Sequence, residues 1–167
     1  MSLATADLHD QHEGKVEVAE PLFRDYGGRS EFHGQVFPVR VFEDNSLVRR
    51  ALEGPGQGRV LVIDGGASLR CALVGDLLAA LAVKNNWNGI LVNGCVRDAG
   101  ALAGIAVGIK ALNTNPRKSV KKGQGEEGVE VTFAGLTFRP GQWLYADRDG
   151  ILISDTKLHS RESTVSS

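Results

Sequence analysis

Cysteine is scarce in this sequence, and the two cysteines that occur, Cys71 and Cys95, are far apart. No Cys-x-x-Cys pair or mixed Cys/His spacing accompanies them, which excludes the usual pattern of a structural zinc site. Both lie inside apolar segments, so we expect small buried thiols that belong to the core. The scarcity also argues against the disulfide framework of small secreted proteins and favours the reducing cytoplasm.

Long apolar runs are missing as well. The apolar stretch at residues 77–83 is closed by Lys84, Asn85 and Asn86 and is too short to cross a bilayer. Residues 1–10 are mildly acidic and contain no basic region followed by an apolar segment, so we expect no secretory signal. These absences lead us to expect a soluble, cytoplasmic protein with no membrane partner.

An excess of charge of either sign is the third absence. The chain has 19 basic and 20 acidic residues, so no overall field favours DNA, RNA or anionic membranes. One small basic cluster, Lys118, Lys121 and Lys122, lies close to Glu126 and Glu127, and we interpret it as a solvated loop. We expect no direct nucleic-acid partner.

The 167 residues are enough for one full core, and no repeat or linker separates two cores. We therefore expect a single mixed α/β domain over residues 1–167. Thr5 can cap a short helix and Pro21 ends any helical option, so we expect an N-terminal helical segment within about residues 1–34. The polar residues at 156–167 are expected to form a frayed tail.

Apolar patterns predict alternating strands and helices in the middle of the chain. Buried strands are expected at residues 35–43, 60–63 and 89–93, and helices at residues 45–52 and 75–86. Strand, helix and strand in this order imply a right-handed parallel crossover. After a further strand at 107–112 and a polar loop at 113–128, short strands are expected at 129–133, 136–138, 143–146 and 151–154.

Three charged residues flank the central crossover. Asp76 begins the second expected helix, and Arg97 and Asp98 follow the strand after it, so twenty residues separate Asp76 from Arg97. The crossover folds this gap back on itself, and ligands of open α/β sheets lie at the carboxyl ends of strands. We therefore predict that the three side chains meet. By composition alone, a helix cap and a surface ion pair would explain the same residues.

The start of the same helix predicts an anion site. First-turn backbone N–H groups have no partner inside a helix, and the helix dipole favours negative charge there. These groups, at Gly75, Asp76, Leu77 and Leu78, would bind a substrate carboxylate.

Such a site has the parts needed to stabilise an enolate, the intermediate common to retro-aldol cleavage of a 4-hydroxy-2-oxo acid and decarboxylation of a 3-carboxy-2-oxo acid. Asp98 can hold a hard divalent cation, Mg²⁺ first and Mn²⁺ as the alternative, which acts as a Lewis acid. Arg97 can donate two parallel hydrogen bonds to the oxo and carboxylate oxygens. Asp76 can orient a water that removes the hydroxyl proton.

Several segments together resemble one known family. They are Asp76 with Arg97 and Asp98 at their spacing, and residues 75–78, 94–98 and 145–150, with further similar stretches at 18–23, 42–45 and 62–66. Over nearly its whole length the chain is similar to the RraA-like family, which includes regulators of ribonuclease E activity and class II 4-hydroxy-4-methyl-2-oxoglutarate aldolases. The resemblance implies a swivelling β/β/α domain and homotrimers with active sites at subunit boundaries. It also implies substrate contacts from Gly75 to Leu78 and from Arg97, and a metal ion on Asp98.

Two departures from the family pattern bear on the activity. Aldolases of the family tend to have a longer C-terminal segment that supplies a carboxylate to a neighbouring subunit, whereas here only Asp155 and Glu162 are acidic after Ser154. Ribonuclease-regulating members often lack acids at the positions of Asp76 and Asp98, which this chain has. We expect a metal-dependent lyase, with oxaloacetate decarboxylation favoured over fast aldol cleavage. The alternative is a non-catalytic inhibitor of ribonuclease E.

Two other patterns have simple structural interpretations. Residues 64–66, Asp-Gly-Gly after a buried strand, invite a methyltransferase assignment, but no full Gly-x-Gly-x-x-Gly follows, so we interpret them as a strand-ending turn. The histidines lack the convergent spacing of a metal site, and we expect them to be solvated. They are His9, His12, His33 and His159.

Overall fold

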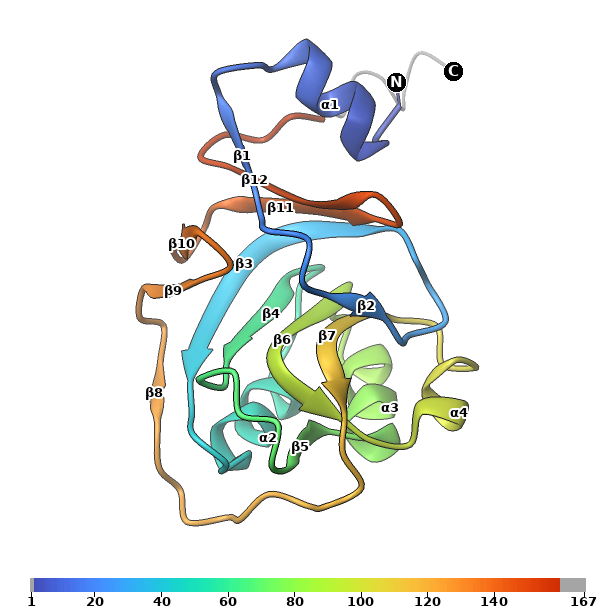
Figure 1. Ribbon diagram of the computed structural model, residues 1–167, viewed down its shortest axis with the longest axis vertical. Coiled ribbons are helices and arrows are strands. Elements are labelled where there is room, and N and C mark those ends of the chain that lie inside the picture. Colours follow the sequence, from blue (N-terminus) through green and yellow to red (C-terminus); the bar gives the residue numbers. More distant parts are fainter. Residues whose placement is uncertain (1, 160–167) are drawn as a thin grey trace.

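The computed structural model describes residues 2–159 and shows a single mixed α/β domain built on one large sheet (Figure 1). The helices are α1 (Thr5–Gln11), α2 (Ser46–Glu53), α3 (Asp76–Lys84) and α4 (Ala99–Leu102). The strands are β1 (Val16–Val18), β2 (Arg24–Asp25), β3 (Phe32–Arg40), β4 (Val60–Asp64), β5 (Ala72–Val74), β6 (Gly89–Val96), β7 (Gly108–Thr114), β8 (Glu126–Glu127), β9 (Val131–Phe133), β10 (Leu136–Phe138), β11 (Trp143–Asp147) and β12 (Gly150–Ser154). The main sheet has the order β1-β12-β11-β3-β4-β6-β7-β2, with β5 beside β6 and β8 beside β3.

Four parallel strands form the centre of this sheet. β3 pairs with β4, β4 with β6, and β6 with β7. β6 is buried along its whole length and β4 along all but its last residue, which is typical of parallel strands that are covered on both faces. The strands predicted at residues 60–63 and 89–93 are thereby confirmed, and β6 continues to Val96.

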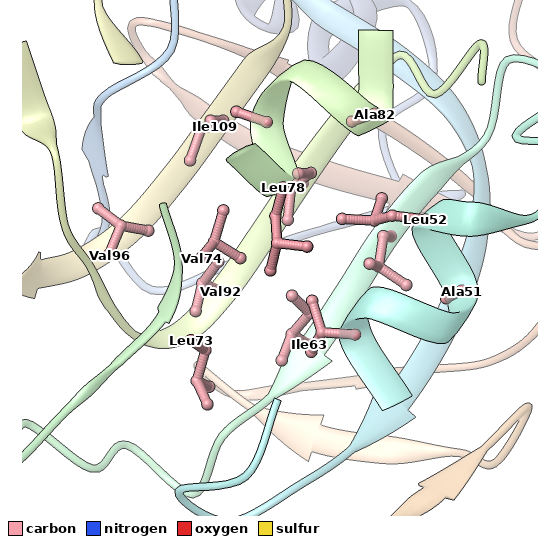
Figure 2. Close-up of a cluster of buried hydrophobic side chains, with 14 of the residues drawn as sticks. Ala51, Leu52, Ile63, Leu73, Val74, Leu78, Ala82, Val92, Val96 and Ile109 are labelled. Carbon is pink, nitrogen blue, oxygen red and sulfur yellow. The ribbon is translucent and has the colours of Figure 1, made fainter. Parts of the chain in front are cut away.

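The helices α2 and α3 cover one face of the parallel centre. Figure 2 shows Leu78 and Ala82 of α3 in one buried cluster with Leu52 of α2 and with Ile63 and Val92 of the strands beneath. Burying one such large aliphatic side chain contributes about 1.5–3 kcal/mol. This packing holds α3 in place against β4 and β6, so the position of its first turn is set by the core.

The other face is covered by the antiparallel part of the chain. The rings of Phe133 and Phe138 stack with centroids 4.6 Å apart, in the same buried cluster as Val62 and Leu91. β11 and β12 extend the sheet beyond β3 by antiparallel pairing. The last third of the chain is therefore largely β, as expected.

Some local expectations were wrong. Within residues 1–34 only α1 is helical, because β1 pairs with β12, β2 pairs with β7, and β3 already begins at Phe32. β5, at residues 72–74, was not predicted from the sequence, and β8 lies inside the expected loop at residues 113–128. Pairing with distant strands, which leaves no local pattern, explains each of these differences.

The end of the described chain is packed rather than frayed. Leu158 is buried, and its backbone N–H donates a hydrogen bond to the Tyr145 hydroxyl at 2.8 Å. The remainder of the predicted tail, residues 160–167, lies outside the described residues. No helix between residues 2 and 159 has the length and apolar character that a bilayer crossing requires.

Candidate active site

The predicted site residues meet where the adjacent strands β5 and β6 end. Val74 of β5 is the register partner of Val96 of β6, and the Arg97 N–H donates to the Val74 carbonyl at 2.9 Å. Gly75 and Asp76 follow β5, while Arg97 and Asp98 follow β6. The parallel pair thus brings the two halves of the motif together, as the spacing predicted.

Asp98 is tied directly to the start of α3. Its Oδ2 accepts a hydrogen bond from the Asp76 backbone N–H at 3.0 Å. A Cβ on Gly75 would lie 2.6 Å from this same oxygen and 3.3 Å from Cγ of Arg97. Glycine is therefore required at position 75 for the close approach of the two chain segments.

The backbone of Asp98 has an uncommon conformation. Its φ of 61° and ψ of 39° place it in the left-handed region, where a residue other than glycine is infrequent and aspartate is among the tolerated types. This conformation turns the chain sharply between β6 and α4.

The Asp98 carboxylate is exposed and ionised. The hydrogen bond from the Asp76 backbone lowers the pKa of Asp98, and the Arg97 charge adds to the effect. Oδ2 accepts only the Asp76 N–H, and an ionised carboxylate has about four lone-pair sites, so Asp98 could still bind a cation. An accessible carboxylate with this charge suits a hard divalent ion.

The surroundings also fit an ion that retains water. Among residues 2–159, no three His, Cys, Asp or Glu side chains gather into a preformed metal cage. A cation would rest on Asp98, with Asp76 nearby, and complete its shell with water and substrate oxygens. Mg²⁺ commonly binds in this way, whereas zinc sites use three or four protein ligands.

The four residues of the predicted anion site contribute unequally. The Asp76 N–H is occupied by Asp98, and the Ala79 N–H donates to the Gly75 carbonyl. The N–H groups of Leu77 and Leu78 remain in the first turn for a ligand. The Leu77 side chain is 74% exposed, whereas that of Leu78 belongs to the core, so both residues would act through their backbone.

Arg97 extends from the end of β6 into the same space. Its Nη1 donates a long hydrogen bond of 3.4 Å to the Pro116 carbonyl, and the side chain is otherwise exposed. This single weak contact leaves most guanidinium donors available to a planar carboxylate or enolate.

These residues line a cavity of about 90 Å³, which is small beside the roughly 300–1,000 Å³ of sites for drug-sized ligands. We call Gly75, Asp76, Leu77, Leu78, Arg97 and Asp98 the motif wall. A second set, the loop wall, consists of Asn45, Arg49, Lys118, Ser119 and Lys121. The small volume favours a substrate of few atoms.

The loop wall was not predicted from the sequence. Lys118 and Lys121 are exposed, as expected of a solvated loop, and isolated bridges from Ala72 to Lys118 and from Asp44 to Val120 hold this loop beside β5 and α2. In Figure 1 the segment between β7 and β8 passes below these elements. Contacts that span so much of the chain leave no local signal in the sequence.

Asp44 holds the loop in place. Its buried carboxylate accepts hydrogen bonds from Ser46 and from the backbone N–H groups of Lys122 and Gln124, at 2.8 and 3.2 Å. Burial alone would raise the pKa of Asp44, but these hydrogen bonds outweigh it and lower the pKa to about 2. Asp44 is thus ionised at neutral pH and links the start of α2 to the loop wall.

Two predictions outside the cavity have different outcomes. Cys71 and Cys95 are free and buried, which confirms their assignment to the core. His33 and His159, expected to be solvated, are half-buried with ring centroids 4.6 Å apart, and burial lowers the pKa of each. His159 Nδ1 lies 2.8 Å from the Tyr145 hydroxyl, a contact that joins the end of the described chain to β11.

The Asp-Gly-Gly turn after β4 serves the fold. Asp64 Oδ1 accepts hydrogen bonds from the Gly66 N–H and from the Asn93 side chain, both at 3.0 Å. Gly66 has a φ of 65°, as a tight turn requires. Asp64 Oδ1 is therefore occupied by the turn and by β6, which agrees with the structural interpretation of residues 64–66.

Comparisons with known proteins agree on the fold but not on the activity. A protein of Alkalilimnicola ehrlichii, named provisionally as a 4-hydroxy-4-methyl-2-oxoglutarate aldolase, is 59% identical over 158 residues, covering 95% of this chain and 98% of that protein. The RNA-processing inhibitor RraA from Thermus thermophilis superposes with a TM-score of 0.91 at 43% identity, covering 96% of this chain and 97% of that chain. A structure from Geobacillus kaustophilus, described as S-adenosylmethionine:2-dimethylmenaquinone methyltransferase, has a TM-score of 0.89 at 42% identity and covers 95% and 97% of the two chains.

A shared fold supports many activities, so these three names cannot decide the chemistry of the present site. The comparisons do show to which family the chain is related. The sequence profile described as RraA-like, Aldolase/RraA, matches residues 5–153, which is most of the chain, and so the chain belongs to the RraA-like family.

Proposed function

We propose that the protein is a divalent-metal-dependent carbon–carbon lyase that acts on small oxo-acids through a pyruvate enolate. The observation that carries the proposal is the joining of Asp98, Arg97 and the first turn of α3 at one small cavity. Aldolase naming among relatives at 50–59% identity supports a lyase. 4-Hydroxy-4-methyl-2-oxoglutarate and oxaloacetate are the two candidate substrates.

The motif wall suggests a division of labour. The N–H groups of Leu77 and Leu78 would hold the substrate carboxylate at the positive end of α3. Arg97 would donate to the oxo oxygen as negative charge develops there. Asp98 would hold Mg²⁺ or Mn²⁺, which when bound supplies Lewis-acid stabilisation of the same charge.

Asp76 would assist proton transfer. In the retro-aldol direction a water oriented by Asp76 takes the C4 hydroxyl proton, the C3–C4 bond breaks, and its electron pair forms the pyruvate enolate. The departing half leaves as a second oxo-acid, and C3 of the enolate then takes up the proton from the same water. In decarboxylation no hydroxyl proton is removed, and the bond to the departing carboxylate breaks to give carbon dioxide and the same enolate.

The direct test measures pyruvate release from both substrates, with added Mg²⁺ or Mn²⁺ and with a chelator. We expect release above the no-enzyme rate that the chelator abolishes and either metal restores. Rates equal to the no-enzyme control for both substrates, or rates indifferent to metal, would contradict the proposal. Calorimetric titration of the metal into the unmodified protein and into the Asp98→Asn variant gives a second readout that does not depend on turnover.

A second candidate function is inhibition of ribonuclease E, which the similarity to the RNA-processing inhibitor RraA favours. We also propose that the protein forms a homotrimer, as members of the family are expected to do. A pull-down and an RNA-cleavage assay with purified ribonuclease E test the first point, and light scattering tests the second. Absence of both binding and inhibition would reject the inhibitor function.

A further inference from the structure

The cavity has an excess of positive charge that the motif wall does not explain. Its lining includes the cations Arg49, Arg97, Lys118 and Lys121 against the carboxylates of Asp76 and Asp98. A divalent cation would increase the excess further. Three of the four cations belong to the loop wall, away from the residues assigned to the metal and the enolate.

The cations of the loop wall are not used in ion pairs of the fold. Across residues 2–159, the salt bridges involve Arg40, Arg50, Arg70, Lys110 and Arg139. Arg50, the direct neighbour of Arg49 on α2, pairs with Glu127 at 3.1 Å and does not line the cavity. Arg49 and Lys121 are exposed and have their charges available to a ligand.

Two polar atoms of the same wall are buried without a partner. Within the described part of the chain, neither Ser119 Oγ nor Asn45 Oδ1 makes a hydrogen bond. Ser119 is only 5% exposed, and the Asn45 amide nitrogen is already engaged by the Leu73 carbonyl at 3.2 Å. A buried hydroxyl is normally paired, so the unpaired Ser119 hydroxyl indicates a missing acceptor such as a ligand oxygen.

We infer that the loop wall is a subsite for a second carboxylate of the substrate, with Arg49 and Lys121 as its charged groups and Ser119 as a hydrogen-bond donor. The inference rests on the proposed function, because it takes the motif wall to hold the 2-oxo-acid end. It adds that the chain itself supplies the selectivity for dicarboxylates over monocarboxylates of equal length. Asp44, which pins the loop, is then the positioning residue of this subsite.

The test compares two acids that differ only at the far end. 2-Oxoglutarate has a carboxylate where 2-oxopentanoate has a methyl group, and binding of each is measured by calorimetry with Mg²⁺ at low ionic strength. We expect 2-oxoglutarate to bind about ten- to hundredfold more tightly, the usual contribution of a hydrogen bond to a charged group. In the double variant Arg49→Met, Lys121→Met the ratio should approach one, with 2-oxopentanoate binding unchanged.

Arg50→Met provides the matched control, since it removes one charge from the same helix without touching the cavity. It should keep the ratio of the unmodified protein, and melting temperatures should show that all variants are folded. An unchanged ratio in the double variant, or a ratio near one in the unmodified protein, overturns the subsite while the proposed function stands. If neither acid binds, the oxo-acid site on the motif wall fails as well.

Inorganic phosphate distinguishes the substrate's own carboxylate from a free anion. If phosphate binds in a manner that depends on Arg49 and Lys121 while the two acids bind equally, the loop wall serves a separate anion and the inference is overturned. If phosphate only competes with 2-oxoglutarate and leaves 2-oxopentanoate unaffected, the shared subsite is supported.

Discussion

The two walls of the cavity are built in different ways. The motif wall comes from residues 75–98, which follow β5 and contain α3 and β6, and its two ends are joined by the pairing of β5 with β6. The loop wall joins α2 to a segment about 70 residues later, and Asp44 makes that connection through hydrogen bonds to Lys122 and Gln124. The first is recognisable from spacing, whereas the second exists only in the folded chain.

This difference suggests separate duties. The motif wall carries the groups that meet the oxo-acid and its metal, and changes there should affect the chemical step. The loop wall carries unpaired positive charge, and changes there should affect which acid is bound. A substitution that changes only the rate of the chemical step, or only the choice of acid, would support this separation of duties, and one that changes both equally would contradict it.

Arg97→Ala should lower the catalytic rate more than any other substitution considered. Loss of one preorganised donor to a developing oxyanion typically lowers kcat by about 10²–10³-fold. Stability should change by no more than about 0.5 kcal/mol, because Arg97 is exposed. Steady-state pyruvate release and a urea denaturation curve check the two parts, with Arg97→Lys as a partial replacement. Normal turnover of Arg97→Ala would remove Arg97 from the mechanism.

Gly75→Ala should have the second-largest effect on activity. The added Cβ would lie 2.6 Å from Asp98 Oδ2, so Asp98 must move away from the start of α3. We expect metal affinity and kcat/KM to fall at least about tenfold, in line with the cost of displacing groups that orient a metal ligand. Gly100→Ala is the control, since nothing lies within 4 Å of a Cβ there. Equal activity of the two variants would contradict the geometry of the motif wall.

Asp44→Asn should affect stability and selectivity more than the chemical step. The pKa of Asp44 is about 2 in the folded protein, against an ordinary value of 3.8, so ionisation of this group contributes about 2 kcal/mol at neutral pH. Because the folded pKa is the lower one, this contribution is present above about pH 4 and is lost as the pH falls towards 2. Urea denaturation from pH 7 to pH 3 should show a smaller acid-induced loss in Asp44→Asn than in the unmodified protein.

The same variant bears on the subsite. Weakening the Asp44 contacts frees the loop that carries Lys121, so the preference for 2-oxoglutarate over 2-oxopentanoate should decline while 2-oxopentanoate binding persists. A variant with reduced stability but undiminished preference would show that Asp44 supports the fold without positioning the loop wall.

The predictable parts of the molecule are those with a local pattern. Uninterrupted apolar runs identified β4 and β6, and the apolar stripe with Leu78 and Ala82 identified α3. Parallel strands joined through a helix then brought Asp76 to Arg97 and Asp98. The contact itself is made through β5, which was not predicted, because β5 pairs with β6 and carries Gly75 and Asp76 to the end of that strand.

The parts that could not be predicted depend on distant contacts. β1 and β2 are short and gain their structure by pairing with β12 and β7. His33 lies on β3, and His159 lies near the end of the described chain. The two rings meet only in the folded protein, where Tyr145 of β11 also contacts His159. No periodicity encodes such meetings, and a lysine-rich loop such as residues 118–122 has the composition of a solvated segment whether or not it lines a cavity.

Leu77→Ala should have the smallest effect, and it tests whether the anion site is a backbone feature. The side chain is 74% exposed, and alanine keeps both the N–H group and the helix. We therefore expect stability to change by less than about 0.5 kcal/mol, as for most surface substitutions, and kcat/KM to change little. Leu78→Ala provides the contrast, because removing a buried leucine costs about 2–5 kcal/mol. A large loss of activity in Leu77→Ala with unchanged stability would mean that the side chain itself meets the substrate or a neighbouring subunit, and the division between the two walls would need revision.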